Sequence, residues 1–242
     1  MTGRTTMARS KKEEEYTTRR NDILDAAQYL VQTKGYEQTS IQDILDRLHI
    51  SKGAFYHYFG SKAALLEAVI TRSIDEAELV MLPIVRDPAL PALEKFNHLY
   101  DVMGRWKTAR RPMLMAILRV WYADDNAVMR QKTVAALIHR VEPLFVEIVR
   151  QGNQEGVFKT TYPERVGGVI ISLIQSFGDE LIQRLLAADK QSDDLERLID
   201  IVLAYNEALE RVLGASPGSI HVVEKDILAA WLAPEDENEI TI

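Results

Sequence analysis

Cysteine is absent from the 242-residue sequence. The chain therefore forms no disulfide bond and offers no thiolate to a metal ion. A protein without cysteine suits a reducing compartment, although such a composition does not require one.

Long apolar runs are also absent. The sequence contains no stretch of about eighteen consecutive apolar residues, so it predicts no membrane-spanning helix. Residues 1–20 are charged along their length and lack the apolar core of a secretory signal. We therefore expect a cytoplasmic protein with no membrane partner.

Recognisable catalytic motifs are missing as well. The histidines share no spacing typical of metal ligands, such as a pair four residues apart. They are His49, His57, His98, His139 and His221. The sequence also has no glycine-rich phosphate loop and no nucleophile elbow. We predict a protein that is not an enzyme, binds no metal and needs no cofactor.

The remaining composition is typical of a globular protein. Apolar residues make up 47% of the chain and charged residues 27%, which is enough to bury a sizeable core. The net charge of −7 argues against DNA binding if the chain is taken whole. Residues 1–72, however, contain eleven Lys and Arg against nine Asp and Glu, whereas the remainder contains 18 against 27. This mild asymmetry favours a nucleic-acid-facing N-terminal part and an acidic body.

Two short amphipathic helices, separated by a three-residue turn, lie between residues 39 and 62. Apolar residues recur in the first helix at three- and four-residue spacing, which is typical of one helical face. They are Ile41, Ile44, Leu45 and Leu48. Ser51 ends the turn and is a good N-cap for the second helix. The apolar residues of that helix are Ala54, Phe55, Tyr58 and Phe59. The pattern predicts a helix-turn-helix, whose second helix can enter the major groove of DNA.

The second helix carries DNA-suited residues away from its apolar face. Gly53 and Ala54 are small enough for close approach to base edges, and Ala54 can touch a thymine methyl group. Lys52 can reach a guanine edge or a phosphate. Tyr56 and His57 can donate hydrogen bonds to phosphate oxygens. We therefore predict that this face binds DNA.

The stretch TKGYEQTSIQDILDRLHISKGAFYHYFGSKAALLEAV resembles the N-terminal domain of TetR-family transcriptional regulators. The match includes the Gly-aromatic pair at 35–36, the recognition-helix pattern over 50–59 and the Ser-Lys pair at 61–62. The resemblance covers about the first 70 residues. It implies phosphate or groove contacts from Thr39, Lys52, Tyr56, His57 and Lys62. It also implies close approach to the bases at Gly53 and Ala54.

Three positions depart from the family pattern, which usually has alanine, alanine and glycine there. This chain has Leu45, Leu48 and His49. The two leucines enlarge the packing between the helices and can change the angle of the recognition helix. His49 stands where glycine takes a positive φ easily, although histidine is among the residues that tolerate it.

The chain divides into four segments, all of them helical or polar, so we expect an all-α fold. Residues 1–16 are polar and predicted to be a flexible N-terminal arm. Residues 17–72 form the predicted DNA-binding domain. Residues 73–214 form the predicted effector-binding and dimerisation domain, and residues 215–242 a short helix with an acidic tail.

Several helix ends are marked by capping and breaking residues. Thr17 or Thr18 is expected to cap the first helix. Thr39, with Gln42 three residues later, resembles a capping box for the second. A long helix is expected to run from Ala63 towards Leu82, and Pro83, Pro88 and Pro91 are expected to end it.

Aromatic and methionine residues on the helical patterns of the body are candidates for the lining of a pocket that binds an apolar or aromatic ligand. They are Phe96, Tyr100, Met103, Trp106, Trp121, His139 and Phe177, with Asn97, His98 and Arg119 as candidate polar anchors. Ordinary core packing would explain any one of the apolar residues equally well. The TetR resemblance implies an effector pocket in the body without identifying its lining.

Residues 164–187 and 193–213 are the most apolar long helical patterns. The resemblance implies that this pair joins its copy in a homodimer, which would place two recognition helices in half-sites roughly 34–36 Å apart. We therefore predict a homodimeric DNA-binding regulator, a repressor that a small-molecule effector releases from a palindromic operator.

Two alternatives remain open. In the first, the same DNA-binding head is controlled by a protein partner. In the second, the chain is a helical small-molecule-binding protein or an enzyme whose head no longer binds DNA. Lys52, Tyr56 and Lys62 argue against the second, since a vestigial head need not keep DNA-suited residues.

Overall fold

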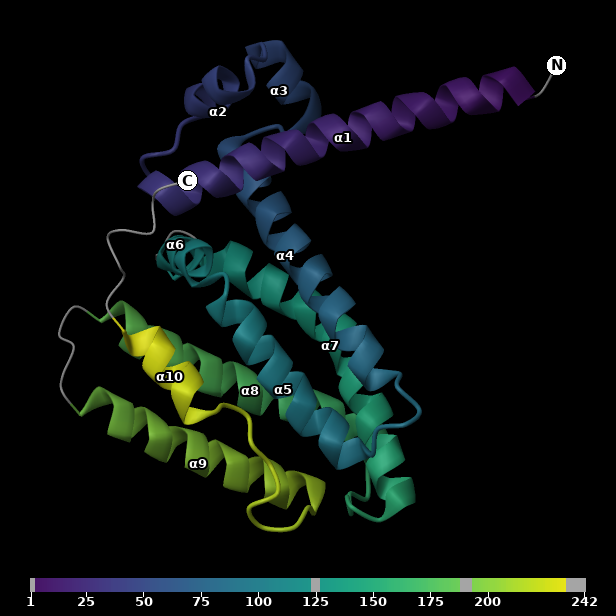
Figure 1. Cartoon of the computed structure of the whole chain (residues 1–242), viewed down its shortest axis with the longest axis vertical. Coiled ribbons are helices and arrows are strands. Elements are labelled where there is room, and N and C mark those ends of the chain that lie inside the picture. The colour runs from purple at the N-terminus through teal and green to yellow at the C-terminus, as the bar shows by residue number, and fades with distance from the viewer. Residues whose placement is uncertain (1–2, 123–126, 188–192, 234–242) are drawn as a thin grey trace.

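The computed structural model describes residues 3–122, 127–187 and 193–233. Every regular element within these ranges is an α-helix, which confirms the all-α fold (Figure 1). The helices are α1 (Gly3–Lys34), α2 (Ile41–Leu48), α3 (Lys52–Tyr58), α4 (Lys62–Val85), α5 (Ala92–Thr108), α6 (Arg111–Trp121), α7 (Ala127–Glu155), α8 (Pro163–Leu186), α9 (Asp194–Leu213) and α10 (Lys225–Leu232). None of these described helices is long and apolar enough to span a membrane.

The head consists of the C-terminal half of α1, the helices α2 and α3, and the start of α4 (Figure 1). These elements surround one apolar cluster, the head core, in which Phe55 is fully buried. Its other large members include Ile23, Leu24, Ile44, Leu45, Phe59, Leu65 and Val69. Phe55 and Phe59 alternate with exposed residues of α3, so the helix is anchored on one face and exposed on the other.

The body is a bundle of α5, α7, α8 and α9, over which α10 packs against α5 and α9. Its core is a separate apolar cluster that includes Phe96, Phe145, Phe158 and Ile170. Two helices connect head and body. The start of α4 lies in the head core and its end in the body core, while α6 packs against α1.

The first helix begins earlier than the sequence pattern predicted. It starts at Gly3, and the hydroxyls of Thr17 and Thr18 donate to the carbonyls of Glu13 and Glu14 within the same helix. The expectation of a helix start at Thr17 or Thr18 is therefore wrong, and from Gly3 on the expected N-terminal arm of residues 1–16 is part of α1. The run of Lys and Glu over residues 11–15 explains this, because both are good helix formers.

Pro83 does not end α4. The helix continues to Val85, and the N–H of Arg86 still bonds to the carbonyl of Leu82 at 3.0 Å. Proline removes only its own N–H donor from the ladder, and here the donors that follow it keep bonding back. The expectation that the helix stops at Leu82 is therefore wrong, but the helix does end before Pro88 and Pro91.

Candidate DNA-binding surface

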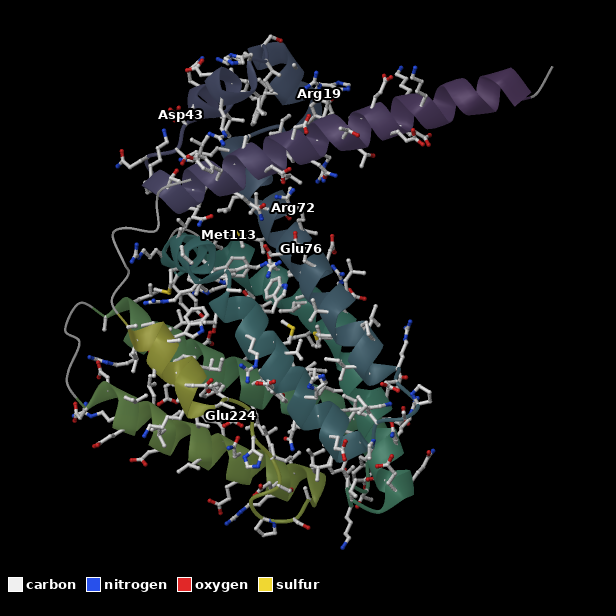
Figure 2. The ribbon with its side chains drawn as sticks, in the orientation of Figure 1. Arg19, Asp43, Arg72, Glu76, Met113 and Glu224 are labelled. Carbon is white, nitrogen blue, oxygen red and sulfur yellow. The ribbon has the colours of Figure 1, made fainter. Side chains whose placement is uncertain are left out.

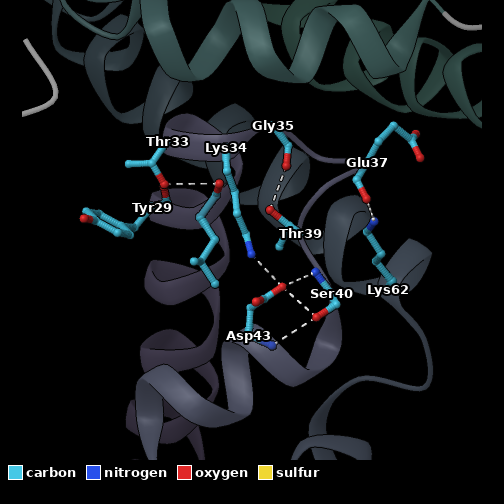
Figure 3. A network of polar contacts seen from close by, with 10 residues as sticks. Tyr29, Thr33, Lys34, Gly35, Glu37, Thr39, Ser40, Asp43 and Lys62 are labelled. Atoms are coloured by element: carbon cyan, nitrogen blue, oxygen red, sulfur yellow. Dashed lines mark hydrogen bonds and ion pairs between the residues drawn. The ribbon is translucent and has the colours of Figure 1, made fainter. Parts of the chain in front are cut away.

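The helix-turn-helix is capped at Ser40 rather than at Thr39. The backbone N–H of Ser40 donates to Asp43 Oδ2 at 2.6 Å, and the N–H of Asp43 donates back to Ser40 Oγ at 3.1 Å (Figure 3). This reciprocal pair is a capping box displaced by one residue from the predicted pair of Thr39 and Gln42. In most capping boxes the residue that accepts this reciprocal bond is Glu or Gln, whereas here it is Asp43.

Asp43 also joins the start of α2 to the end of α1. Lys34 Nζ lies 2.7 Å from Asp43 Oδ2, in the network drawn in Figure 3. Hydrogen bonds from Lys34 and then from Ser40 hold the pKa of the Asp43 carboxyl well below its usual range. The carboxylate is therefore charged at neutral pH and fixes the angle at which α2 leaves α1.

Thr39 is a packing residue of the turn before α2. The residue is only 3% exposed, and its hydroxyl donates to the carbonyl of Gly35 at 2.7 Å (Figure 3). Its backbone N–H bonds to the carbonyl of Tyr36 at 3.1 Å. Both donors are thus used inside the protein, which is at odds with the implied contact of Thr39 with DNA.

His49 adopts the left-handed conformation that the missing glycine would favour. Its φ is 52° and its ψ 44°, and in the described chain it is the only residue other than glycine with a positive φ. The N–H groups of His49 and Ile50 both bond to the carbonyl of Leu45, which closes the end of α2. The exposed imidazole therefore occupies a backbone position at which most side chains are strained.

The recognition helix α3 starts at the predicted cap. Ser51 Oγ accepts the N–H of Ala54 at 3.1 Å. Lys52, Gly53 and Tyr56 are exposed, as is His57, while Ala54 is half-buried. Four of the predicted DNA contacts therefore lie on one accessible stretch of a short, rigidly anchored helix.

Lys62 lies at the start of α4 and is held by the turn after α1. Its Nζ donates to the carbonyl of Glu37 at 3.4 Å (Figure 3). The same Nζ lies 4.1 Å from the centroid of the Tyr36 ring. A cation–π contact of this kind orients an ammonium group without neutralising it. Lys62 thus keeps the positive charge that a phosphate contact needs.

Tyr16 is a neighbour of the recognition helix that the sequence pattern did not reveal. Its ring centroid lies 4.8 Å from that of Tyr58 and 5.7 Å from that of His57, where the two rings meet edge to face. The contact exists because α1 extends back past the predicted start. The sequence could have placed Tyr16 beside α3 only if the first helix had been predicted to start before Thr17.

The seven predicted effector residues do not share one cavity. Phe96 and Tyr100 stack with Phe145 in the body core, and Phe177 stacks with Tyr205 between α8 and α9. Met103 packs at the edge of the body core, Trp106 lies under the guanidinium of Arg110, and His139 is exposed. Trp121 belongs to the head core, together with Ile117 and Val120 of the same helix. Trp121, which was expected to line a pocket, therefore faces the head instead.

Two cavities at the surface of the body are lined by candidate residues. One, of about 190 Å³, lies between α5 and the segment before α10, and Tyr100 is the only one of the seven candidates that lines it. Asn97 and His98 also line it, but both polar groups of Asn97 bond to the backbone of Ser219 and His221. The other cavity, of about 250 Å³, lies between α6, the end of α8 and α10, and Arg119 lines it.

Polar contacts between α1, α4 and α6 join the head to the body. Arg72 of α4 donates to Asp25 of α1 at 2.7 Å and also to Gln28. One turn further along α4, Glu76 lies 3.8 Å from the guanidinium of Arg110, at the start of α6. Figure 2 shows Arg72 and Glu76 at the junction of head and body. These contacts join α4 to α1 on one side and to the start of α6 on the other.

The chain matches two family models. "Bacterial regulatory proteins, tetR family" covers residues 23–69, and "Tetracyclin repressor-like, C-terminal domain" covers residues 120–192. The first range coincides with the head core, from α1 to the start of α4.

Named relatives and a solved structure are similar over most of the chain. The uncharacterized HTH-type transcriptional regulator YfiR of Bacillus subtilis is 22% identical over 193 residues, which are 77% of this chain and 89% of YfiR. The HTH-type transcriptional repressor KstR2 of Mycobacterium tuberculosis is 23% identical over 146 residues, 59% of this chain and 70% of KstR2. A TetR-family transcriptional regulator of Pectobacterium atrosepticum superimposes with a TM-score of 0.63 at 20% identity, over 84% of this chain and 98% of that one. That structure has the same fold.

Proposed function

Because the chain belongs to the tetR family of bacterial transcriptional regulators, we propose that it is a homodimeric repressor released from a palindromic operator by a small-molecule effector. The helix-turn-helix head binds the DNA, and the body receives the effector. KstR2 is itself named a transcriptional repressor, which favours repression over activation.

The exposed face of α3 carries this proposal. Phe55 and Phe59 anchor the helix in the head core, so Lys52, Tyr56 and His57 are held outward by a fixed scaffold. A lysine at the start of a recognition helix can meet a guanine edge or a phosphate, and tyrosine and histidine can donate to phosphates. The absence of a side chain at position 53 lets the backbone approach the groove closely.

A salt-dependent binding experiment tests this function. The protein is titrated with a palindromic fragment from the region upstream of its own gene, at about 50 mM and about 200 mM salt. Release of counterions from several phosphates should lower the affinity by roughly a thousandfold or more over this range. An affinity that does not change with salt would contradict the phosphate contacts.

A matched pair of lysine variants locates the binding face. Lys52→Gln should weaken binding to the fragment, whereas Lys225→Gln, the same change at an exposed position of α10, should not. Both variants remove one positive charge, so a general effect of net charge would reduce both affinities equally. Equal losses would therefore exclude α3 as the binding face.

Exposed apolar residues on α8 and α9 support the homodimer. Val169 on α8 is 47% exposed and Leu203 on α9 is 59% exposed. The two helices pack against each other in the body, so both residues lie on a helix pair whose inner side is already covered. A second copy of the chain would remove these side chains from water, and pairing would give the two-fold symmetry that a palindrome requires.

A further inference from the structure

The cavity between α6, the end of α8 and α10 has features of a ligand site. Its volume is about 250 Å³. Three of its lining residues are Arg111, Met115 and Arg119, which follow one another at four-residue spacing on a single face of α6. The remaining lining residues are Leu185 and Leu186 at the end of α8, Ala187 just after it, and Trp231 on α10. None of the seven predicted effector residues is among them.

The polar part of this lining is cationic. Among the described residues that line the cavity, Arg111 and Arg119 are the charged ones, and none is a carboxylate. One terminal nitrogen of Arg111 donates to the carbonyl of Ala233, which holds the guanidinium in place. The Nε of Arg111 is buried and has no acceptor within the described part of the chain. An unpaired buried donor is unfavourable, and it is most so on a charged group, so an anionic acceptor would be stabilising here.

The other part of the lining is apolar and well ordered by packing. Met115, Leu185 and Trp231 are buried in one cluster with Ile227. The indole N–H of Trp231 donates to the hydroxyl of Thr108 at 2.9 Å, which fixes the orientation of the ring. Small-molecule sites in proteins usually have such a lining, which is mostly apolar with a few polar groups.

The cavity lies on the opposite side of α6 from the head. Met113, Ile117 and Val120 pack on the head core, and Figure 2 shows Met113 just below the head. Met113 precedes Met115 by two residues, which is roughly 200° around the helix axis. A ligand that pushes on the face of Met115 therefore pushes α6 towards the head.

We propose that this cavity binds a small anionic amphiphile, and that its occupation weakens DNA binding through α6. The guanidinium groups of Arg111 and Arg119 neutralise the head group, and the tail lies on Met115, Leu185 and Trp231. The cavity is smaller than the roughly 300–1,000 Å³ of sites for drug-sized ligands, so the tail is short. This inference rests on the proposed function, and it replaces the expected apolar or aromatic effector with one that carries a negative charge.

Calorimetric titration of the full-length protein with octanoate tests the site. Octanoate should bind with one site per chain, while 1-octanol and inorganic phosphate, which each lack one half of the ligand, should bind at least tenfold more weakly. Stronger binding by phosphate would instead identify a plain anion site and overturn the amphiphile. Absence of octanoate binding would overturn the proposal as a whole.

Arginine variants assign the binding to this cavity. Arg119→Gln and Arg111→Gln should each weaken octanoate binding about tenfold or more, the usual effect of losing a hydrogen bond to a charged group. Arg105→Gln, on the exposed side of α5 and outside the cavity, should leave it unchanged. Arg119 is exposed, so its variant should fold even if Arg111→Gln does not. Unchanged binding in Arg119→Gln would overturn the assignment.

A DNA-binding assay separates this inference from the function on which it rests. Saturating octanoate should lower the affinity of the wild-type protein for its operator fragment at least fivefold, and should have a smaller effect on Arg119→Gln. If the protein binds the fragment and octanoate does not change that affinity, the coupling is wrong and the DNA-binding function stands. If the protein binds no operator in any condition, the proposed function fails while calorimetry still decides the site.

Discussion

The left-handed turn at His49 allows a quantitative test of how the recognition helix is placed. The exposed side chain makes no packing contribution that a substitution would remove, so the backbone conformation dominates the effect. A residue other than glycine in this conformation costs about 1–2 kcal/mol, with histidine towards the lower end. Glycine removes that cost but loses about 0.5–1 kcal/mol to its more flexible unfolded state. His49→Gly should therefore stabilise the head by no more than about 1 kcal/mol.

A β-branched residue at the same position should act in the opposite direction. His49→Val places a stiff side chain at a positive φ, which costs about 1–3 kcal/mol. His49→Asn is the matched control, because asparagine tolerates this conformation and should be nearly neutral. For a chain of this size, a change of 1 kcal/mol moves the melting temperature by roughly 2–4 °C.

Thermal unfolding followed by circular dichroism measures this series. The expected order of stability is Gly at or above His, with Asn close to His and Val clearly lowest. DNA affinity should fall in the Val variant, because the turn sets the angle between α2 and α3. A Val variant as stable as the wild type would refute the reasoning, since it would mean that residue 49 does not hold a positive φ in the folded protein.

Four further predictions concern DNA contacts, acid stability, assembly and coupling. Lys62→Ala should weaken binding to all DNA sequences alike and reduce the slope of log affinity against log salt by about one. Ala54→Ser should instead change which DNA sequence is preferred. If Ala54→Ser weakened binding to all sequences equally, a base contact by Ala54 would be excluded. Folding lowers the pKa of the Asp43 carboxyl, so the charged carboxylate stabilises the folded head at pH values above the ordinary pKa of about 3.9. This stabilisation is lost as the pH falls below that value. Asp43→Asn should therefore make the stability of the head less sensitive to acid in a pH denaturation series. Leu203→Glu should convert the dimer to a folded monomer at micromolar concentration in sedimentation, and a stable dimer would place the interface elsewhere. Arg72→Met should leave the fold intact by circular dichroism but reduce the effect of any bound effector on DNA affinity, because it removes the polar contact between α4 and α1.

Local pattern was enough to find the helix-turn-helix and its outward face. The spacing of Ile44, Leu45, Phe55 and Phe59 revealed which sides of α2 and α3 are buried, and Ser51 marked the start of the recognition helix. These features depend on residues within about one or two turns of each other, so periodicity and capping chemistry determine them. The sequence alone could not show whether Thr39 or Ser40 caps α2, because both hydroxyls suit an N-cap. In the folded protein Thr39 is buried and Ser40 is the cap.

Tertiary structure alone decided what each apolar face is packed against. Trp121 was predicted as an apolar residue that lines a ligand pocket, yet it packs on the head core, as Met113 of the same helix also does. The cavity beside Arg111, Arg119 and Trp231 combines helices from distant parts of the chain, and no spacing in the sequence connects them. The physical reason is that the hydrophobic effect has no direction: it requires an apolar face to leave water but does not specify the partner, which only the assembled packing of all the helices selects.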